Sequence, residues 1–301
     1  MSTTPEPGDG VTISSGTLAA TFLPGLGMLG VSLRHHDAEL LALPGGLDGY
    51  RAGRVTGLPL LAPWANRLGA WRYEVAGTVV SLDGLDLHTD EHGLPIHGNL
   101  TAQPGWEVVA TDGRSLSARF DVGAHPQLLA AFPFPHELRI DAAVDATTLT
   151  VATTLTPTAE RAVPVAFGFH PYLRLADLPR AEARLRLPAR THLEVDERGL
   201  PTGAHQAAAA EDELLGARAF DDLYELGEDR RLSVSGGGRR VTVVVGDGYR
   251  YAQVFTPPTP DAVCLEPMTA AVNALVDGGY ELVAPGGSFT ARFAVQAEDS
   301  P

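Results

Sequence analysis

The sequence predicts an all-β protein, and three observations lead to that prediction. Where a hydrophobic pattern is clear, it alternates with a period of two, which is typical of strands with one buried face. The chain contains 33 glycines and 23 prolines, which interrupt these runs at short intervals, as folds of many short strands require. No strand–helix alternation of the kind that builds a parallel α/β sheet is visible. We therefore expect one all-β domain over residues 1–301, with residues 1–10 as a flexible tail.

The clearest strands lie in the middle of the chain. In the segment 116–122, Leu116, Ala118, Phe120 and Val122 share one face. The segments 138–144 and 149–155 also alternate, and the short turn at Asp145-Ala146 separates them, so we expect an antiparallel hairpin.

Two further strands are expected near the end of the chain. Val241, Val243 and Val245 alternate just before the glycine-containing turn at residues 246–248. Residues 289–295 form the last expected strand. The best helical candidate is residues 204–219, which include four consecutive alanines. Because glycines flank and interrupt that segment and no apolar stripe runs along it, we expect a short helix or a loop there.

Composition and charge exclude several classes of partner. The formal net charge of −15 disfavours nucleic acid and anionic membranes, both of which would repel the protein. No apolar run approaches the roughly 20 residues that a membrane-spanning helix needs. The first ten residues lack the basic region and apolar core of a signal peptide. We therefore expect a cytoplasmic protein, as a monomer or a homodimer, without a membrane partner.

Cys264 is the only cysteine, so an intrachain disulfide and a multi-cysteine zinc site are both excluded. It lies in the apolar run 262–265, which predicts a buried small hydrophobic residue and not a nucleophile. Three histidines lie within ten residues at His88, His92 and His97, but their spacing matches no metal-binding motif. We therefore expect no metal ion.

Five polar clusters spread along the chain are candidates for one sugar-binding acid/base site. They are Asn66-Arg67, Ile96-His97-Gly98, Gly168-Phe169-His170-Pro171-Tyr172, Phe220-Asp221-Asp222 and Leu265-Glu266-Pro267. A guanidinium group held by a proline-limited apolar segment offers several fixed donors to neighbouring hydroxyls. An aspartate can accept hydrogen bonds from further hydroxyls. Each cluster has a structural alternative, such as a surface arginine paired with an acid, so the prediction depends on their joint occurrence.

His170 and Glu266 are the candidates for proton transfer. His170 follows an apolar alternation and precedes a proline, which places it at the end of a core strand. A histidine there can give or take a proton near neutral pH. Glu266 follows the apolar run 262–265, and a carboxylate in such a position has its pKa raised towards that of a general base.

Taken in order, these clusters resemble the aldose 1-epimerase (galactose mutarotase) family. Further similarity comes from Gly16–Ala20, Leu29–Leu33, Trp71-Arg72-Tyr73, Leu200–Gly203 and Cys264–Thr269, with Asn273 just beyond. The resemblance covers nearly the whole chain. It implies a large antiparallel β-sandwich, with the sugar in an open cleft and no cofactor.

The resemblance also implies roles for the site residues. Glu266 resembles the general base that takes the proton from the anomeric hydroxyl, and His170 resembles the acid that protonates the ring oxygen. Arg67, His97, Asp221 and Asn66 then bind the substrate. Asp221-Asp222 stands where the galactose enzymes usually have Asp-His, and residues 172–175 differ from their usual Tyr-Phe-Asn-Leu. These differences place the chain nearer to a divergent branch of the family than to the galactose enzymes.

Three other functions are compatible with the same residues. An epimerase of a hexose 6-phosphate or another anionic sugar would need basic side chains beside the substrate, and Arg72, Arg174 and Arg51 or Arg54 are the candidates. A non-catalytic sugar-binding protein would keep Arg67 and Asp221 but has no use for His170 and Glu266. A glycoside hydrolase would use Asp221 and Glu266 across a glycosidic bond, which leaves the histidines without a role.

Overall fold

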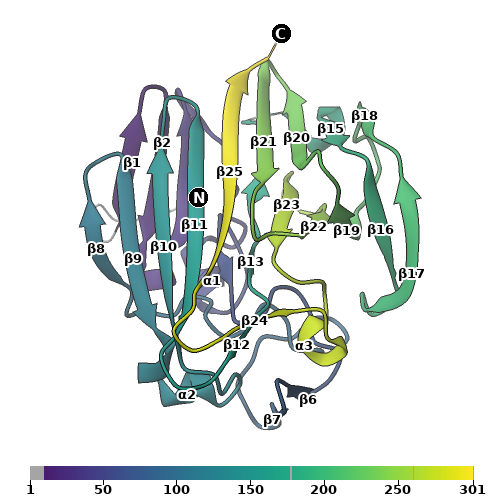
Figure 1. Cartoon of the computed structure of the whole chain (residues 1–301). Helices are drawn as coiled ribbons and strands as arrows, with labels where there is room; N and C mark the ends of the chain where they lie inside the picture. Colours follow the sequence, from purple (N-terminus) through teal and green to yellow (C-terminus); the bar gives the residue numbers. More distant parts are fainter. Residues whose placement is uncertain (1–9, 177, 260, 301) are drawn as a thin grey trace.

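The structure is a computed structural model that describes residues 10–176, 178–259 and 261–300 (Figure 1). Apart from Gly10, the predicted N-terminal tail lies outside the described residues. Strands dominate, and they form two packed layers. Among the described residues, no helix combines the length and the apolar character that crossing a membrane requires.

One layer is a nine-stranded antiparallel sheet with the order β18-β15-β20-β21-β25-β11-β10-β9-β8. Figure 1 shows most of these strands side by side, with β25 near the centre. Their bounds, in chain order, are β8 Glu107–Thr111, β9 Ser115–Asp121, β10 His136–Val144, β11 Thr148–Pro157, β15 Arg184–Leu187, β18 Glu211–Leu214, β20 Arg231–Gly236, β21 Arg239–Val245 and β25 Phe289–Asp299.

The opposite layer consists of two sheets. A four-stranded sheet, β1-β2-β3-β4, packs against β9, β10 and β11. An eight-stranded sheet, β17-β16-β19-β22-β23-β13-β5 with β14 paired to β23, carries the other half of the layer. Their bounds are β1 Val11–Ser15, β2 Leu18–Leu23, β3 Leu29–His35, β4 Ala38–Glu39, β5 Leu60–Leu61, β13 Gly168–Phe169, β14 Tyr172–Leu173, β16 Arg190–Val195, β17 Pro201–Ala208, β19 Asp221–Leu226, β22 Tyr251–Phe255 and β23 Val263–Met268.

Short elements close the ends of the two layers. The pairs β6–β7 and β12–β24 are two-stranded sheets, and no helix in the described part of the chain exceeds two turns. The bounds are β6 Arg72–Val75, β7 Thr78–Ser81, β12 Val163–Val165, β24 Glu281–Val283, α1 Gly46–Arg51, α2 Pro126–Leu129, α3 Ala274–Asp277 and the 3-10 turns Pro24–Leu26, Val122–Ala124 and Arg180–Glu182.

The alternating patterns of the sequence form the core between the layers. β10 and β11 are the expected hairpin, with Leu138 opposite Leu155 and Val144 opposite Leu149. The predicted inward-facing residues of β9 and β21 are buried as well, as are Ala291, Phe293 and Val295 of β25. Because alternate side chains on a strand point to one face, each alternating run supplies one wall of the same core. The predicted all-β sandwich is confirmed.

The prediction of a short helix or loop at residues 204–219 is wrong for residues 204–208 and 211–214, which form strands. Residues 201–208 form β17, which pairs with β16 at the edge of the eight-stranded sheet, and residues 211–214 form β18 at the edge of the other layer. The intrinsic helix preference of consecutive alanines is small per residue. Two open sheet edges supply backbone partners to this segment, and those tertiary hydrogen bonds override its local preference.

Candidate active site

A cleft of about 310 Å³ opens on the eight-stranded sheet and on the loops beside it. All six residues that the sequence predicted for the site line this cleft, namely Asn66, Arg67, His97, His170, Asp221 and Glu266. They come from segments up to 200 residues apart in the chain, counting from 66 to 266. The fold therefore brings together the predicted set.

The register of three strands places the carboxylates. Gln253 on β22 lies opposite Glu266 on β23, and Asp221 on β19 lies opposite Phe255 on β22. Since side chains alternate between faces, these four residues share one face of the sheet. Asp222 points to the other face, where its Oδ1 lies 3.0 Å from His192 Nε2. Of the two adjacent aspartates, Asp221 is therefore the one that lines the cleft.

His170 and Glu266 form a direct contact at the bottom of the cleft. His170 Nε2 lies 3.2 Å from Glu266 Oε1, and their side chains are only 5% and 2% exposed. Burial raises the pKa of Glu266 well above its usual range, and the nearby Asp221 carboxylate adds to this effect, whereas Arg67 opposes it. Burial also lowers the pKa of His170 to about 3. The two shifts favour a pair that carries a single proton and no net charge.

Aromatic rings hold the His170 imidazole in place. Tyr172 stacks on it, with ring centroids 4.6 Å apart and nearly parallel planes, and Phe255 meets it edge-on. His97 also approaches edge-on, with its centroid 5.5 Å away. Burial, together with His170, His88 and Arg67, lowers the pKa of His97 well below its usual value, so its imidazole is neutral at neutral pH. A neutral imidazole can both donate and accept a hydrogen bond.

Two loops are joined to present Arg67 and His97. The backbone N–H of His97 donates to the carbonyl of Asn66 over 2.9 Å, and both residues have left-handed backbone conformations. Gly98 follows with φ of +71°, and a Cβ there would lie 2.0 Å from the carbonyl oxygen of Ala62. Glycine is thus required at this position, because any side chain would separate the two segments.

Arg67 is a buried cation with several partners. Its Nε donates to Asp90 Oδ2 over 2.8 Å, and its Nη1 donates to Asn66 Oδ1 over 3.2 Å. Its Nη2 lies 3.5 Å from Asp221 Oδ2. The alternative interpretation, a surface arginine paired with an acid, is therefore wrong about exposure, because the Arg67 side chain is buried. It is right about the acid, which is Asp90.

Sequence reasoning missed Asp90 and Gln253. Asp90 Oδ1 accepts the backbone N–H groups of His92 and Leu94, which builds the turn that carries its other oxygen to Arg67. Gln253 Nε2 donates to Asp221 Oδ1 over 2.6 Å. The glycine three residues after Asp90 marks a turn. A turn signal does not indicate that Asp90 contacts Arg67, 23 positions away. Gln253 lies in an apolar strand, and nothing in the sequence around it indicates a role in the site.

The ligand atoms of His170, Cys264 and Glu266 lie within 4.8 Å of one another, which is close enough to consider a metal ion. Sulfur binds metals as the thiolate. Burial and the neighbouring Glu266 raise the pKa of the Cys264 thiol well above its ordinary value, so the thiol stays protonated. This donor set suits proton transfer better than metal binding. The prediction that Cys264 is a buried small residue is confirmed.

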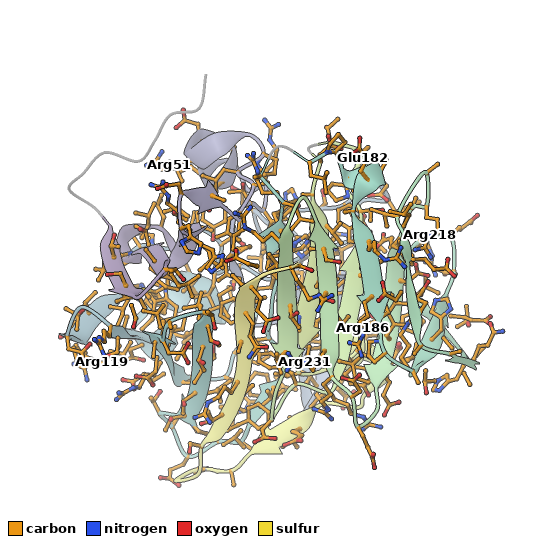
Figure 2. The ribbon with its side chains drawn as sticks, turned by 90° about the horizontal axis from the view of Figure 1, so that it is seen from above. Arg51, Arg119, Glu182, Arg186, Arg218 and Arg231 are labelled. Carbon is orange, nitrogen blue, oxygen red and sulfur yellow. The ribbon has the colours of Figure 1, made fainter. Side chains whose placement is uncertain are left out.

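The arginines considered for an anionic sugar, Arg51, Arg54, Arg72 and Arg174, are not among the residues that line the cleft. Arg51 is the exposed last residue of α1 (Figure 2), and its Nη1 lies 3.1 Å from Asp48 Oδ1. The guanidinium of Arg174 donates to the backbone carbonyl of Ala176. The ionisable lining residues include one guanidinium, that of Arg67, and the four carboxyl groups of Asp90, Glu91, Asp221 and Glu266. Such a lining favours uncharged, hydroxyl-rich ligands.

Solved structures with this fold are numerous. A galactose mutarotase-like protein from Clostridium acetobutylicum aligns with a TM-score of 0.83 at 16% identity, over 97% of this chain and 95% of that one. Galactose 1-epimerase from Lactobacillus acidophilus gives 0.78 at 13% identity, over 100% and 98% of the two chains. A galactose mutarotase related enzyme from the same organism gives 0.76 at 18%, over 96% and 97%. At these identities the likeness establishes the fold alone.

Sequence comparison identifies the family more directly. No curated protein matches the chain. However, the sequence profile described as Aldose 1-epimerase matches residues 11–296, which include every residue of the cleft named above. The chain therefore belongs to the aldose 1-epimerase family, and it is an isomerase that acts on sugars.

Proposed function

We propose that this protein is a mutarotase that interconverts the α and β anomers of an uncharged aldohexose, with Glu266 and His170 as its proton-transfer pair. The observation that carries the proposal is the buried 3.2 Å contact between His170 Nε2 and Glu266 Oε1 at the bottom of a polar cleft. A binding protein has no need of such a pair. Isolating two titratable groups from water is costly, and active sites are where such shifted groups gather.

The reaction requires two proton transfers and no other reagent. In ring opening, the Glu266 carboxylate takes the proton from the hydroxyl on C1, and the His170 imidazolium gives a proton to the ring oxygen as the C1–O5 bond breaks. Glu266 is then protonated and His170 is neutral. After rotation about C1–C2, the same two transfers run in reverse and close the ring on the other face.

The pair begins and ends each turnover with one proton, so no exchange with solvent is needed. The raised pKa of Glu266 and the lowered pKa of His170 make the uncharged form, with the proton on Glu266, the favoured one, because burial disfavours separated charges. The charged form that opens the ring therefore arises from it by one proton transfer within the pair. The proton passes between Glu266 and His170 across their direct contact. The cyclic sugar can therefore react with the charged form of the pair, and the open-chain sugar can react with the uncharged form.

The remaining predicted residues bind and orient the sugar in this proposal. Arg67 donates to hydroxyl groups from the end of its guanidinium that faces the cleft, and Asp221 accepts from others. His97 is neutral and can contact a hydroxyl as donor or acceptor. Asn66 acts mainly through Arg67, whose guanidinium and backbone N–H both donate to its Oδ1.

The charge of the cleft favours a neutral substrate over an anionic one. A phosphate group close to the lining carboxylates would meet repulsion in a partly buried site, where Coulomb interactions are weakly screened. Arg67 has only limited capacity for such a group, since Asp90 already engages its Nε. An uncharged aldohexose avoids this cost.

The test is proton NMR magnetisation exchange between the anomers of glucose and of galactose, with glucose 6-phosphate as the anionic comparison. Catalytic amounts of the wild type should accelerate exchange of at least one neutral sugar and act less on the phosphate. Glu266→Gln keeps the shape of the side chain and removes its ability to take a proton, so acceleration should be lost. Saturation-transfer binding by this variant separates lost chemistry from lost binding.

Two outcomes would overturn the proposal. Binding without accelerated exchange in the wild type would identify a sugar-binding protein. A stronger effect on glucose 6-phosphate than on both neutral sugars would identify an anionic substrate, in spite of the carboxylate-rich lining.

A further inference from the structure

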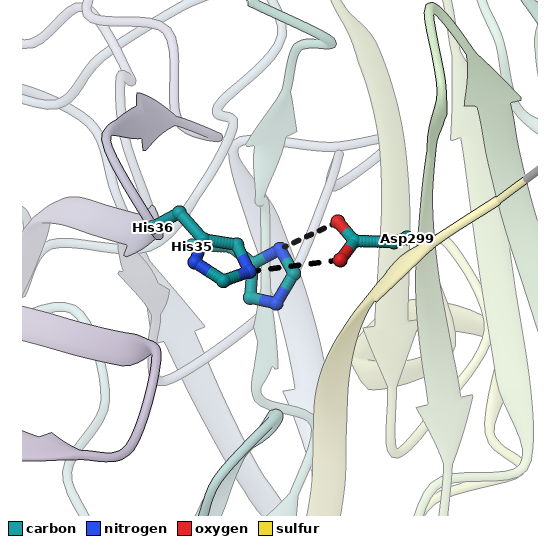
Figure 3. Close-up of side chains that lie close together, drawn as sticks. All are labelled: His35, His36 and Asp299. Atoms are coloured by element: carbon teal, nitrogen blue, oxygen red, sulfur yellow. Dashed lines mark ion pairs between the residues drawn. The ribbon is translucent and has the colours of Figure 1, made fainter.

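A second group of histidine and carboxylate side chains lies outside the cleft, where the first sheet meets the last strand. It consists of His35, His36 and Asp299, which we call the His-His-Asp cluster (Figure 3). His35 Nδ1 lies 3.9 Å from Asp299 Oδ1, and His36 Nε2 lies 3.6 Å from Asp299 Oδ2. The potential ligand atoms of all three residues lie within 4.8 Å of one another.

The backbone explains how adjacent histidines reach one point. Successive residues of a strand point to opposite faces, so His35 and His36 would diverge if β3 continued. However, β3 ends at His35, and His36 has a left-handed conformation with φ of +52°. As a result the two rings lie together, with centroids 4.5 Å apart, and Asp299 at the end of β25 faces both (Figure 3).

His35 has a buried ring nitrogen without a hydrogen-bond partner. Its side chain is only 2% exposed, and its Nδ1 makes no hydrogen bond within the part of the chain that the structure describes. A buried polar atom without a partner costs free energy, so such atoms are rare unless something else binds them. The unpartnered nitrogen points towards the Asp299 carboxylate, into the space between the three side chains (Figure 3).

We propose that the His-His-Asp cluster binds a divalent transition-metal ion of the zinc type, through His35 Nδ1, His36 Nε2 and the Asp299 carboxylate. Two imidazoles and one carboxylate are common zinc ligands, and the fourth position is filled by water. Ligands about 2.1 Å from a tetrahedral ion are about 3.4 Å apart, which is slightly less than the separations here. His36 and Asp299 are half or more exposed and can close this difference by side-chain rotation, whereas His35 is fixed.

The local charges are compatible with this assignment. Asp299 contributes a negative charge, while Arg239 lies opposite it in the β21–β25 ladder and contributes a positive one. These two charges offset each other locally, and Glu298, the preceding residue, faces the other side of β25 and lies opposite Arg240. Because the whole chain carries a formal charge of −15, a divalent cation is still not repelled overall.

The position of the site gives the ion a structural role. His35 ends the third strand of the chain and Asp299 is the last residue of the final strand, so one ion joins two sheets in different layers. Binding to the folded state alone shifts the unfolding equilibrium towards that state. The ion would thus hold the end of β25 against the N-terminal sheet, well away from the proton-transfer pair.

The test is calorimetric titration of the full-length protein with Zn²⁺, after treatment with a chelator. The variants are His36→Asn, since asparagine tolerates the left-handed backbone, and Asp299→Asn, which keeps shape and removes charge. The matched control is His205→Asn, at an exposed histidine of β17. We expect one bound Zn²⁺ in the wild type and in the control, and affinity reduced by about tenfold or more in both cluster variants.

Thermal unfolding gives a second readout that does not depend on catalysis. Zn²⁺ should raise the unfolding temperature of the wild type and of His205→Asn, but not that of Asp299→Asn. Absence of Zn²⁺ binding to the wild type would overturn the assignment. Equal affinity in wild type and His36→Asn would do the same, and sugar that displaces the ion would place it in the cleft instead. A failed mutarotase assay leaves this test intact.

Discussion

Two histidine–carboxylate pairs on the same sheet have nearly equal separations and different surroundings. His170 and Glu266 are 3.2 Å apart with side chains at most 5% exposed, whereas His192 and Asp222 are 3.0 Å apart with both side chains 28% exposed. Burial raises the pKa of Asp222 as well, but the adjacent His192 opposes the rise. Only the first pair faces the cleft. Distance alone therefore does not distinguish a catalytic pair from a structural one, whereas burial and the facing side of the sheet do.

The largest expected effect is on kcat. It should follow from substitutions in the His170–Glu266 pair and not from substitutions in the His192–Asp222 pair. Glu266→Gln and His170→Asn should each lower kcat by about 10² to 10⁴-fold, because general acid or base assistance is lost. His192→Asn and Asp222→Asn should change kcat by less than about threefold, since this pair is partly exposed and does not face the cleft. Anomer exchange by NMR measures all four. Similar losses in both pairs would end the distinction.

The next effect is on the free energy of unfolding. It compares the buried Arg67–Asp90 ion pair at the cleft with the exposed Arg34–Asp37 pair. Asp90→Asn leaves the Arg67 guanidinium without its 2.8 Å carboxylate partner in a buried position, which should lower the free energy of unfolding by about 3 kcal/mol. Asp37→Asn, at the exposed pair with Arg34, should leave the free energy of unfolding unchanged within the error of the measurement. Chemical denaturation checks both. Equal changes would mean that Asp221 compensates for Asp90.

A smaller effect separates the two adjacent aspartates. Asp221→Asn removes a charged acceptor from the cleft and should lower kcat/KM by about tenfold, mainly through KM. Asp222→Asn should change kcat/KM by less than about twofold, because its side chain lies on the other face of β19. Steady-state kinetics on the best neutral sugar gives the comparison, and a larger loss from Asp222→Asn would refute the assignment of Asp221.

The smallest expected effect is the dependence of catalysis on pH. A pair with one proton loses activity when it gains a second proton or loses the first. The second proton must bind His170, whose pKa is about 3, and the first leaves Glu266, whose pKa is raised. We therefore expect no loss of kcat/KM as the pH falls from about 7 to about 5, because His170 takes up no second proton in that range. A loss on acidification with its midpoint near the 6.5 of an ordinary histidine would show that His170 protonates independently of Glu266.

Most of the strands were predictable because they depend on local patterns, whereas the convergence of the six cleft residues was expected only from the resemblance to the aldose 1-epimerase family. The alternation in residues 138–155 required a hairpin with one buried face, and the register of β10 and β11 confirms it. The helix or loop expected at residues 204–219 was wrong, because sheet edges that are distant in sequence provide its hydrogen-bond partners. Local preference is a weak signal wherever such an edge is available.

The sequence by itself determined the residue types of the cleft, the alternation that builds the core, and the membership of the family. Only the tertiary structure decided which aspartate faces the cleft, that Asp90 and Gln253 complete its polar network, and that His35, His36 and Asp299 lie together. The physical reason is that residue type and spacing specify what a side chain can do and which face of its strand it occupies. Its partners and its burial depend on how strands far apart in the chain pair and pack.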